Sequence, residues 1–215
     1  MYEAAIQVLK KVNNLGYEAY IVGGYPRDLY RGVQNEDIDI CSNIKKEILL
    51  SNFEVLSSTP FGSFIIKYNR FSFQFTLFRK EIYTTNRYPK ISYVSSLFED
   101  LMRRDFIMNT LCIDSNHNYI DLMNAKKDID QKIIRVVGDI DTKMKEDPLR
   151  IVRALRFSVD LDFTIEPHLK EYIINHKEIL KNLSKTRIEK EIEKVSQVTN
   201  FYKLIKELDL TKYIQ

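Results

Sequence analysis

The sequence predicts an α+β fold, in which a small twisted mixed β-sheet with helices is followed by an all-helical part. Short apolar runs alternate with helical periodicity in the first part of the chain. Residues 71–77 alternate strictly between apolar and polar side chains, which is typical of a strand with one buried face. From about residue 142, helical patterns follow one another with Lys and Glu on exposed faces. We therefore expect two domains, 1–140 and 141–215.

Composition limits the class of protein. The 215 residues are 44% apolar and 29% charged, which is ordinary for a soluble globular chain. No apolar run approaches the roughly 20 residues that span a bilayer, and the start of the chain lacks a basic signal-peptide region, so we expect a cytoplasmic protein without a membrane partner. Cys41 and Cys112 have no paired spacing typical of a zinc or redox centre. A net charge of +3 is too small to prove nucleic-acid binding.

Local patterns predict the individual elements. Gly16 ends the first helical pattern, and Pro26 suits the first turn of a short helix that stops at Gly32. Segments with alternating or apolar character predict strands. In order, the expected elements are a helix over 3–14, a strand over 19–22, a short helix ending before residue 32, strands over 36–40 and 53–56, a hairpin over 61–79, a mobile loop over 81–93, helices over 97–103 and 105–111, and a strand over 133–137.

The stretch that begins at Gly23 and Gly24 carries the strongest functional signal. Two glycines at a strand end let the backbone approach a bulky anion, and Arg27 lies one helical turn further on, where it can reach a phosphate. Asp37 and Asp39 follow two positions apart, so that on a strand both carboxylates project from one face. A phosphate-binding turn beside two carboxylates suits Mg²⁺-dependent chemistry on a nucleotide. The alternative for the two acids alone is a polar edge strand or a turn.

A second pair, Arg104 and Asp105, lies between two predicted helices. There a guanidinium can bind a triphosphate, and a carboxylate can accept hydrogen bonds from ribose hydroxyls. The alternative is that Asp105 only caps the helix that follows. The sequence at this position leaves both interpretations open.

Basic residues repeat along a third segment. Asp147 precedes a proline, which suits a helix start, and Arg150, Arg153 and Arg156 recur at every third position as a cationic ridge that an apolar-packed helix would avoid. Asp147 and Arg150 occupy neighbouring positions on that face. Cytosine and adenine present an amino donor beside a ring-nitrogen acceptor, so a carboxylate next to a guanidinium pairs with C or A and mismatches G or U. The alternative is that Asp147 is only a helix cap.

These motifs, in this order, resemble the signatures of the polymerase-β-like nucleotidyltransferases. More narrowly, the chain is similar to the class II CCA-adding enzymes (tRNA nucleotidyltransferases) and the bacterial poly(A) polymerases. The resemblance implies a catalytic head up to residue 140 and a helical neck beyond it. The segments that carry the resemblance are 23–32 with 37–39, 103–110, 119–125 with 134–135, 146–157 and 183–191.

The resemblance implies template-independent addition of C and A residues to the 3′ end of tRNA, from CTP and ATP with Mg²⁺. Asp37 and Asp39 would hold the metal and carry catalysis. The implied nucleotide-binding residues are Gly23, Gly24, Arg27, Arg104, Asp105, Asn109, Asp147, Arg150, Arg153 and Arg156. Of these, Asp147 and Arg150 would recognise the base, so that the protein itself selects CTP and ATP.

Two departures from the family pattern leave alternatives open. Gln74 stands where the family commonly carries an acid, and family members usually continue into further helical domains beyond the length of this chain. The rival functions are poly(A) addition, addition of only CC or only A, and a nucleotide- or RNA-binding module with degenerate catalysis. The expected loop over 81–93 argues against CC-only addition, because the resemblance implies a shortened loop in that case.

Overall fold

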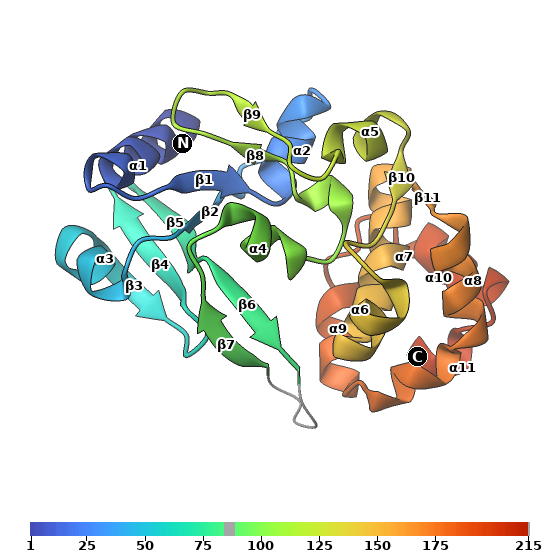
Figure 1. Ribbon diagram of the computed structural model, residues 1–215. Coiled ribbons are helices and arrows are strands. Elements are labelled where there is room, and N and C mark those ends of the chain that lie inside the picture. The colour runs from blue at the N-terminus through green and yellow to red at the C-terminus, as the bar shows by residue number, and fades with distance from the viewer. Residues whose placement is uncertain (84–88, 215) are drawn as a thin grey trace. The chain divides into compact units, whose positions relative to one another are not determined.

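The computed structural model describes residues 1–83 and 89–214 and confirms the α+β class (Figure 1). The chain divides into two compact units. The first unit comprises Met1–Arg104 and Asn109–Lys126, and the second comprises Asp105–Met108 and Lys127–Gln215. A division of function between 1–140 and 141–215 stays a prediction. Within residues 1–83 and 89–214, no helix has the length and apolar character needed to cross a membrane.

The first unit is built on a seven-stranded mixed sheet. Its strands, in spatial order, are β3 (Glu54–Ser58), β4 (Ser63–Tyr68), β5 (Phe71–Leu77), β2 (Asp39–Ser42), β1 (Ala19–Val22), β8 (Cys112–Ile113) and β9 (Tyr119–Ile120). β2 and β5 are parallel, and the other neighbouring pairs are antiparallel. This register places the Cα of Asp39 opposite that of Gln74. The expected hairpin is confirmed as β4 and β5, and β5 lies beside the strand that carries Asp39.

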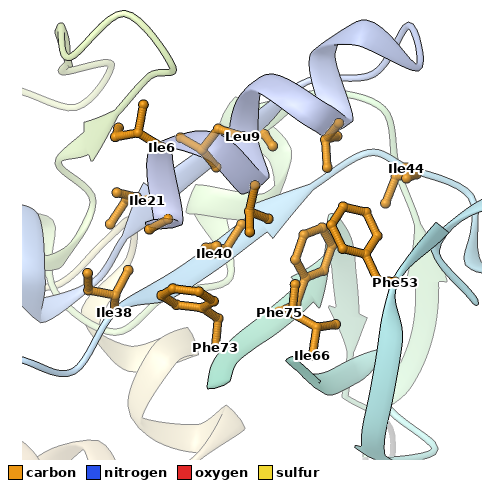
Figure 2. Close-up of a cluster of buried hydrophobic side chains, with 14 of the residues drawn as sticks. Ile6, Leu9, Ile21, Ile38, Ile40, Ile44, Phe53, Ile66, Phe73 and Phe75 are labelled. Atoms are coloured by element: carbon orange, nitrogen blue, oxygen red, sulfur yellow. The ribbon is translucent and has the colours of Figure 1, made fainter. Parts of the chain in front are cut away.

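One face of this sheet is apolar and packs against α1 (Tyr2–Asn14). Apolar residues recur along α1 at helical spacing, so that one side of the helix is buried. Phe73 and Phe75 of β5 are at most 1% exposed, and truncating either to Ala would cost about 3–5 kcal/mol. Figure 2 shows this core, with Ile6, Leu9, Ile21, Ile38, Ile40, Ile44, Phe53, Ile66, Phe73 and Phe75 labelled.

The opposite face of the sheet is part core and part polar. Cys41 packs there in a cluster with Leu97 of α4 (Leu97–Met102). Because side chains alternate along a strand, Asp39 and Gln74 share this face with Cys41. Gln74 is exposed and Asp39 is half-buried. The polar positions of the sheet therefore lie beside a small second core, on the face that α1 does not cover.

A second, two-stranded sheet corrects part of the sequence prediction. The segment expected as a loop over 81–93 instead contributes to β6 (Arg79–Ile82) and β7 (Lys90–Tyr93), which pair antiparallel. Charged and polar side chains on both strands concealed the alternation that identifies strands. Residues 84–88 lie outside the described residues. The remaining helices of this unit are α2 (Gly24–Tyr30) and α3 (Lys46–Asn52).

The helix expected over 105–111 is wrong. Only a short 3₁₀ turn, η1 (Ile107–Asn109), forms there. The backbone of this segment pairs with a distant one instead, because the N–H of Ile107 donates to the carbonyl of Arg135 at 2.9 Å and the N–H of Val137 donates to that of Asp105 at 3.0 Å. Long-range pairing of this kind overrides helix propensity.

The second unit is mainly helical, as expected. The strand expected over 133–137 forms as β10 (Ile133–Ile134), and one departure is β11 (Thr164–Ile165), a second two-residue strand that pairs with it in parallel. Helix α7 contacts both α9 and α10. The helices are α6 (Ile140–Glu146), α7 (Leu149–Leu161), α8 (Pro167–Asn175), η2 (Lys177–Asn182), α9 (Lys185–Ile192), α10 (Val198–Glu207) and α11 (Thr211–Ile214), and α5 (Ala125–Asp130) precedes them.

Candidate functional site

The turn between β1 and α2 brings Gly23 against Asp39. The pairing of β1 with β2 sets the Cα of Val22 opposite that of Asp39. Gly23 follows with φ of +88°, in the left-handed region that glycine adopts without strain. A Cβ on Gly23 would lie 3.3 Å from Oδ2 of Asp39, and one on Gly24 would lie 3.4 Å from Nη2 of Arg27. The two glycines therefore let the backbone pass close to both predicted site residues.

Asp39 is a carboxylate in an unfavourable place. Burial, and then the neighbouring Asp37 carboxylate, raise the pKa of Asp39 to about 6, while Arg104 opposes them. A half-buried acid beside a second acid is an arrangement that a cation stabilises. Among the described residues, no group of three or more His, Cys, Asp or Glu side chains is placed to hold a metal ion. Asp37 and Asp39 carry hard oxygen donors of the kind that Mg²⁺ prefers, and their binding of a cation stays a prediction.

Asp37 does not lie on a strand, which corrects the prediction of a strand over 36–40. β2 begins at Asp39, so Asp37 belongs to the loop between α2 and β2 and is exposed. Strand alternation therefore does not aim its carboxylate. Instead, the N–H of Asp37 donates to Oδ1 of Asn35 at 2.8 Å, and Ile38 on its other side is 2% exposed in the core.

Arg27 is buried in a hydrogen-bonded fork. Its Nε and Nη2 each donate to a carboxylate oxygen of Asp28 at 2.9 Å, and its Nη1 donates to Oδ1 of Asn109 at 2.6 Å. Arg27, Asp28 and Asn109 are each less than 10% exposed. The fork brings together two predicted nucleotide-binding residues that are 82 positions apart in the chain. Contact of Arg27 with a phosphate stays a prediction.

Arg104 is held by Asp100 of α4. Its Nη2 donates to Oδ2 of Asp100 at 3.0 Å, and Nε of Arg103 donates to Oδ1 of the same residue at 2.9 Å. Burial alone would raise the pKa of Asp100, which is 0% exposed, but the two guanidinium groups hold it below its usual range. Nε of Arg104 is a buried donor for which the described residues supply no acceptor. The fold thus leaves one N–H of Arg104 unpaired in its interior, and contact of Arg104 with a phosphate stays a prediction.

In the second unit, Asp147 and Arg150 flank the start of α7. Oδ1 of Asp147 accepts from the N–H of Leu149 at 3.1 Å, and both its carboxylate oxygens accept from Nη2 of Arg187 at 2.9–3.0 Å. Nη1 of Arg150 donates to Oε2 of Glu146 at 2.8 Å. Pro148, and not Asp147, is the N-cap of α7, while Asp147 accepts from the N–H of Leu149 in the first turn and is also an ion-pair partner. Its pairing with a base is not tested by these contacts.

The cationic ridge of α7 is matched by acids. Nη2 of Arg153 donates to Oδ2 of Asp105 at 2.6 Å, and Nε of Arg156 donates to Oε1 of Glu191 on α9 at 2.7 Å. Burial would raise the pKa of Glu191, but Arg153 and Arg156 outweigh it and lower that pKa. Asp105 also accepts from the N–H of the next residue, Phe106, at 2.7 Å, but no helix of the expected length follows.

The predicted residues divide between the two units. Asp37, Asp39, Gly23, Gly24, Arg27, Arg104 and Asn109 belong to the first, and Asp105, Asp147, Arg150, Arg153 and Arg156 to the second. Sequence reasoning gave no role to three residues that hold these side chains, Asp28, Asn35 and Asp100. Their only signal is that each is a polar residue close to a motif. Which charges pair was decided by the fold and not by spacing.

Comparison with known proteins places this geometry in a family. Residues 19–135 match the model of the poly A polymerase head domain. A CCA-adding enzyme from Lactobacillus johnsonii is 37% identical over 199 residues, which cover 91% of this chain and 50% of the relative. The chain thus spans about half the length of the curated relatives it matches.

Solved structures agree with the sequence comparison. The Bacillus stearothermophilus CCA-adding enzyme in complex with CTP has a TM-score of 0.89 at 28% identity, covering 99% of this chain and 53% of that one. A tRNA nucleotidyltransferase complexed with a primer tRNA and an incoming ATP analog has a TM-score of 0.77 at 27% identity, covering 97% and 61%. With more than half of its residues inside the family model, this chain belongs to the poly A polymerase head-domain family.

Proposed function

We propose that this chain is a template-independent RNA nucleotidyltransferase that adds C and A residues to the 3′ end of tRNA, using CTP and ATP. The observation that carries the proposal is the acidic pair at the end of the Gly23–Gly24 turn, where burial and Asp37 raise the pKa of Asp39 to about 6. Relatives named as CCA-adding enzymes, and similar structures with CTP or with tRNA and an ATP analog, support this substrate class.

Asp37 and Asp39 would hold a divalent cation, which we propose is Mg²⁺. Bound there, Mg²⁺ would lower the pKa of an attacking hydroxyl and neutralise charge on the leaving pyrophosphate. Gly23 and Gly24, whose backbone passes close to Asp39 and Arg27, would bind the triphosphate together with the guanidinium of Arg104. We further propose that Arg27, Asp105 and Asn109 contact the nucleotide, either directly or through the contacts described above.

Base selection is proposed for the start of α7. The Asp147 carboxylate would accept from the amino group of cytosine or adenine, and the Arg150 guanidinium would donate to the ring nitrogen beside it. Guanine and uracil present the reverse order, so the Asp147 carboxylate would face an acceptor and the Arg150 guanidinium would face a donor. Each group left unpaired in this way would cost about 1–3 kcal/mol. Arg153 and Arg156, held by Asp105 and Glu191, would support that helix.

The test is incorporation into tRNA that lacks its 3′ end, with each labelled nucleotide supplied in turn. We expect CTP and then ATP to be incorporated. Asp37→Ala should reduce the rate by about 1000-fold, because a bound cation contributes several kcal/mol to the transition state. Glu36→Ala, its exposed neighbour in the same loop, is the matched control. Unchanged activity in Asp37→Ala would refute the metal assignment.

A second variant tests base selection separately. Arg150→Ala should accept UTP and GTP in addition to CTP and ATP, because the variant no longer penalises the wrong hydrogen-bonding order. Retained selectivity would exclude Arg150 from base recognition.

One rival is poly(A) addition, the activity that the family description names, although the relatives named as CCA-adding enzymes support CCA addition. Repeated incorporation of ATP alone would support this rival over CCA addition. Gln74, in register with Asp39, favours the other, a binding module with degenerate catalysis. Nucleotide binding without any incorporation would support that second rival.

A further inference from the structure

Asp37 lies in the loop between α2 and β2, where no strand orients its side chain. A metal ligand must be held in place, because freezing a free side chain costs free energy at the moment of binding. The residues of this loop from Gly32 to Asp37 are exposed, with one exception, Asn35, which is half-buried. Asn35 is therefore the residue of this loop that is best placed to fix Asp37.

Asn35 connects Asp37 to a buried anchor. Its Oδ1 accepts from the N–H of Asp37 at 2.8 Å, which closes the local turn that asparagine side chains form with the residue two positions on. Its Nδ2 donates to Oδ2 of Asp28 at 2.8 Å. Both hydrogen bonds have good length, and they use opposite ends of one planar amide.

The anchor itself is rigid. Asp28 is 7% exposed and accepts two hydrogen bonds from Arg27, while its carbonyl accepts from the N–H of Val33 at 2.8 Å. Arg27 in turn donates to Asn109. A continuous set of hydrogen bonds thus runs from Asn109 through Arg27, Asp28 and Asn35 to the backbone of Asp37, entirely within the first unit.

We propose that Asn35 is a positioning residue that orients Asp37 toward a hydrated divalent cation shared with Asp39. The inference rests on the proposed function in one respect, the assignment of Asp37 and Asp39 as cation ligands. Asn35 does not touch the cation. It acts through the backbone of Asp37, in the way that partners of metal ligands commonly act.

The test measures cation binding and not turnover. Mn²⁺ is used as the probe, and free Mn²⁺ is counted by electron paramagnetic resonance with CTP present and RNA omitted. Asn35→Ala should bind Mn²⁺ about tenfold more weakly than the unsubstituted protein, the usual loss for a partner of a metal ligand. Asn35→Ser should recover most of the affinity, because its hydroxyl can still accept from the N–H of Asp37.

Gln34→Ala is the matched control, since Gln34 is an exposed amide in the same loop, and its Mn²⁺ affinity should not change. Circular dichroism spectra should be the same for all three variants, and each should unfold well above the temperature of the binding assay, which separates positioning from loss of fold. Asn35→Ala with unchanged affinity, or Asn35→Ser as weak as Asn35→Ala, would overturn the proposal.

Two further measurements keep this inference separate from the proposed function. If Asp37→Ala binds Mn²⁺ as tightly as the unsubstituted protein, the ligand assignment fails and the role of Asn35 fails with it. If the Mn²⁺ results are as expected but tRNA lacking its 3′ end is not extended, the positioning role stands and CCA addition fails.

Discussion

Asp39 is an acid whose ionised form is disfavoured by its surroundings in the folded protein. Its pKa is raised to about 6, so at neutral pH the ionised form destabilises the folded state relative to the unfolded chain, in which an Asp has its ordinary pKa. Strain of this kind is common where binding, and not stability, sets the choice of residue.

The first prediction follows for Asp39→Asn. Without metal at neutral pH, the variant should be about 1–2 kcal/mol more stable than the unsubstituted protein, less than the full pKa difference would give because solvent partly screens the carboxylate. Urea unfolding in EDTA measures this. The same variant should lose nucleotide incorporation. A variant that is less stable without metal would contradict the interpretation of Asp39 as a strained acid.

Asp100 presents the opposite case and gives the second prediction. Arg104 and Arg103 hold the pKa of Asp100 below its usual range, so its contribution to stability is present above about pH 4, the unfolded-state pKa, and is lost as pH falls through the lower folded-state pKa. Asp100→Asn should cost about 3–5 kcal/mol at neutral pH, because it leaves buried guanidinium groups uncompensated.

This cost should shrink as pH falls below about 4, because the carboxyl of Asp100 takes up a proton first in the unfolded chain and then, at its lower pKa, in the folded protein. Urea unfolding across a pH series checks it. Asp162→Asn, at a carboxylate exposed on the surface, should show no such convergence. A cost that is independent of pH would rule out the buried ion pair as its cause.

At the level of single residues, the sequence did not predict how the candidate side chains are held. Asp39 lies at the strand end beside Gly23, as the motif indicates. Asp37 was predicted on the strand, but its backbone follows the turn made by Asn35. That turn depends on a buried partner, Asp28, and no periodicity in the sequence reports such a partner.

At the level of elements, prediction succeeded where a pattern reflects one buried face. Helix α1, strand β1 and the hairpin of β4 and β5 follow directly from apolar spacing. It failed where distant backbone decides, as in the segment around Ile107, which pairs with Arg135. It also failed for β6 and β7, whose two faces are both polar enough to hide the alternation.

The third prediction is for Gly62, in the turn between β3 and β4, which lies close to Tyr93 of β7. Gly62 has φ of +74°, and a Cβ there would lie 2.7 Å from Cε1 of Tyr93. Gly62→Ala should cost about 2–3 kcal/mol, from backbone strain together with displacement of the ring. In a Tyr93→Ala background the cost should fall to about 1–2 kcal/mol, because only the strain remains. Equal costs in the two backgrounds, by urea unfolding, would show that the ring is not involved.

At the level of the whole molecule, candidate site residues belong to two compact units, each with its own core. The sequence predicted a change of character near residue 140. The first unit instead ends at Lys126, and residues 105–108 do not belong to it. These four residues join the second unit because their backbone pairs with the segment after Ile134. A boundary set by such pairing cannot be located from composition.

The fourth prediction uses the ligand as a probe of the folded chain. CTP with Mg²⁺, at about 100 times its dissociation constant, should stabilise the fold by about 2.7 kcal/mol. For a chain of this size that corresponds to a rise of about 5–10 °C in unfolding temperature. EDTA, or Asp37→Ala, should remove the metal-dependent part of the shift. An equal shift with EDTA present would mean that the nucleotide binds without a cation.

The pairing of β2 with β5 has a consequence for the order in which the cation and the nucleotide bind. Gln74, and not an acid, faces the same space as Asp39. In the free protein, a cation bound as proposed would therefore meet two carboxylates, those of Asp37 and Asp39, and one neutral amide. Such an incomplete shell holds a lone ion loosely, and the missing ligands are the oxygens that a triphosphate carries. If Asp37 and Asp39 hold the cation as proposed, we expect the cation and the nucleotide to bind together, as the metal salt of the nucleotide.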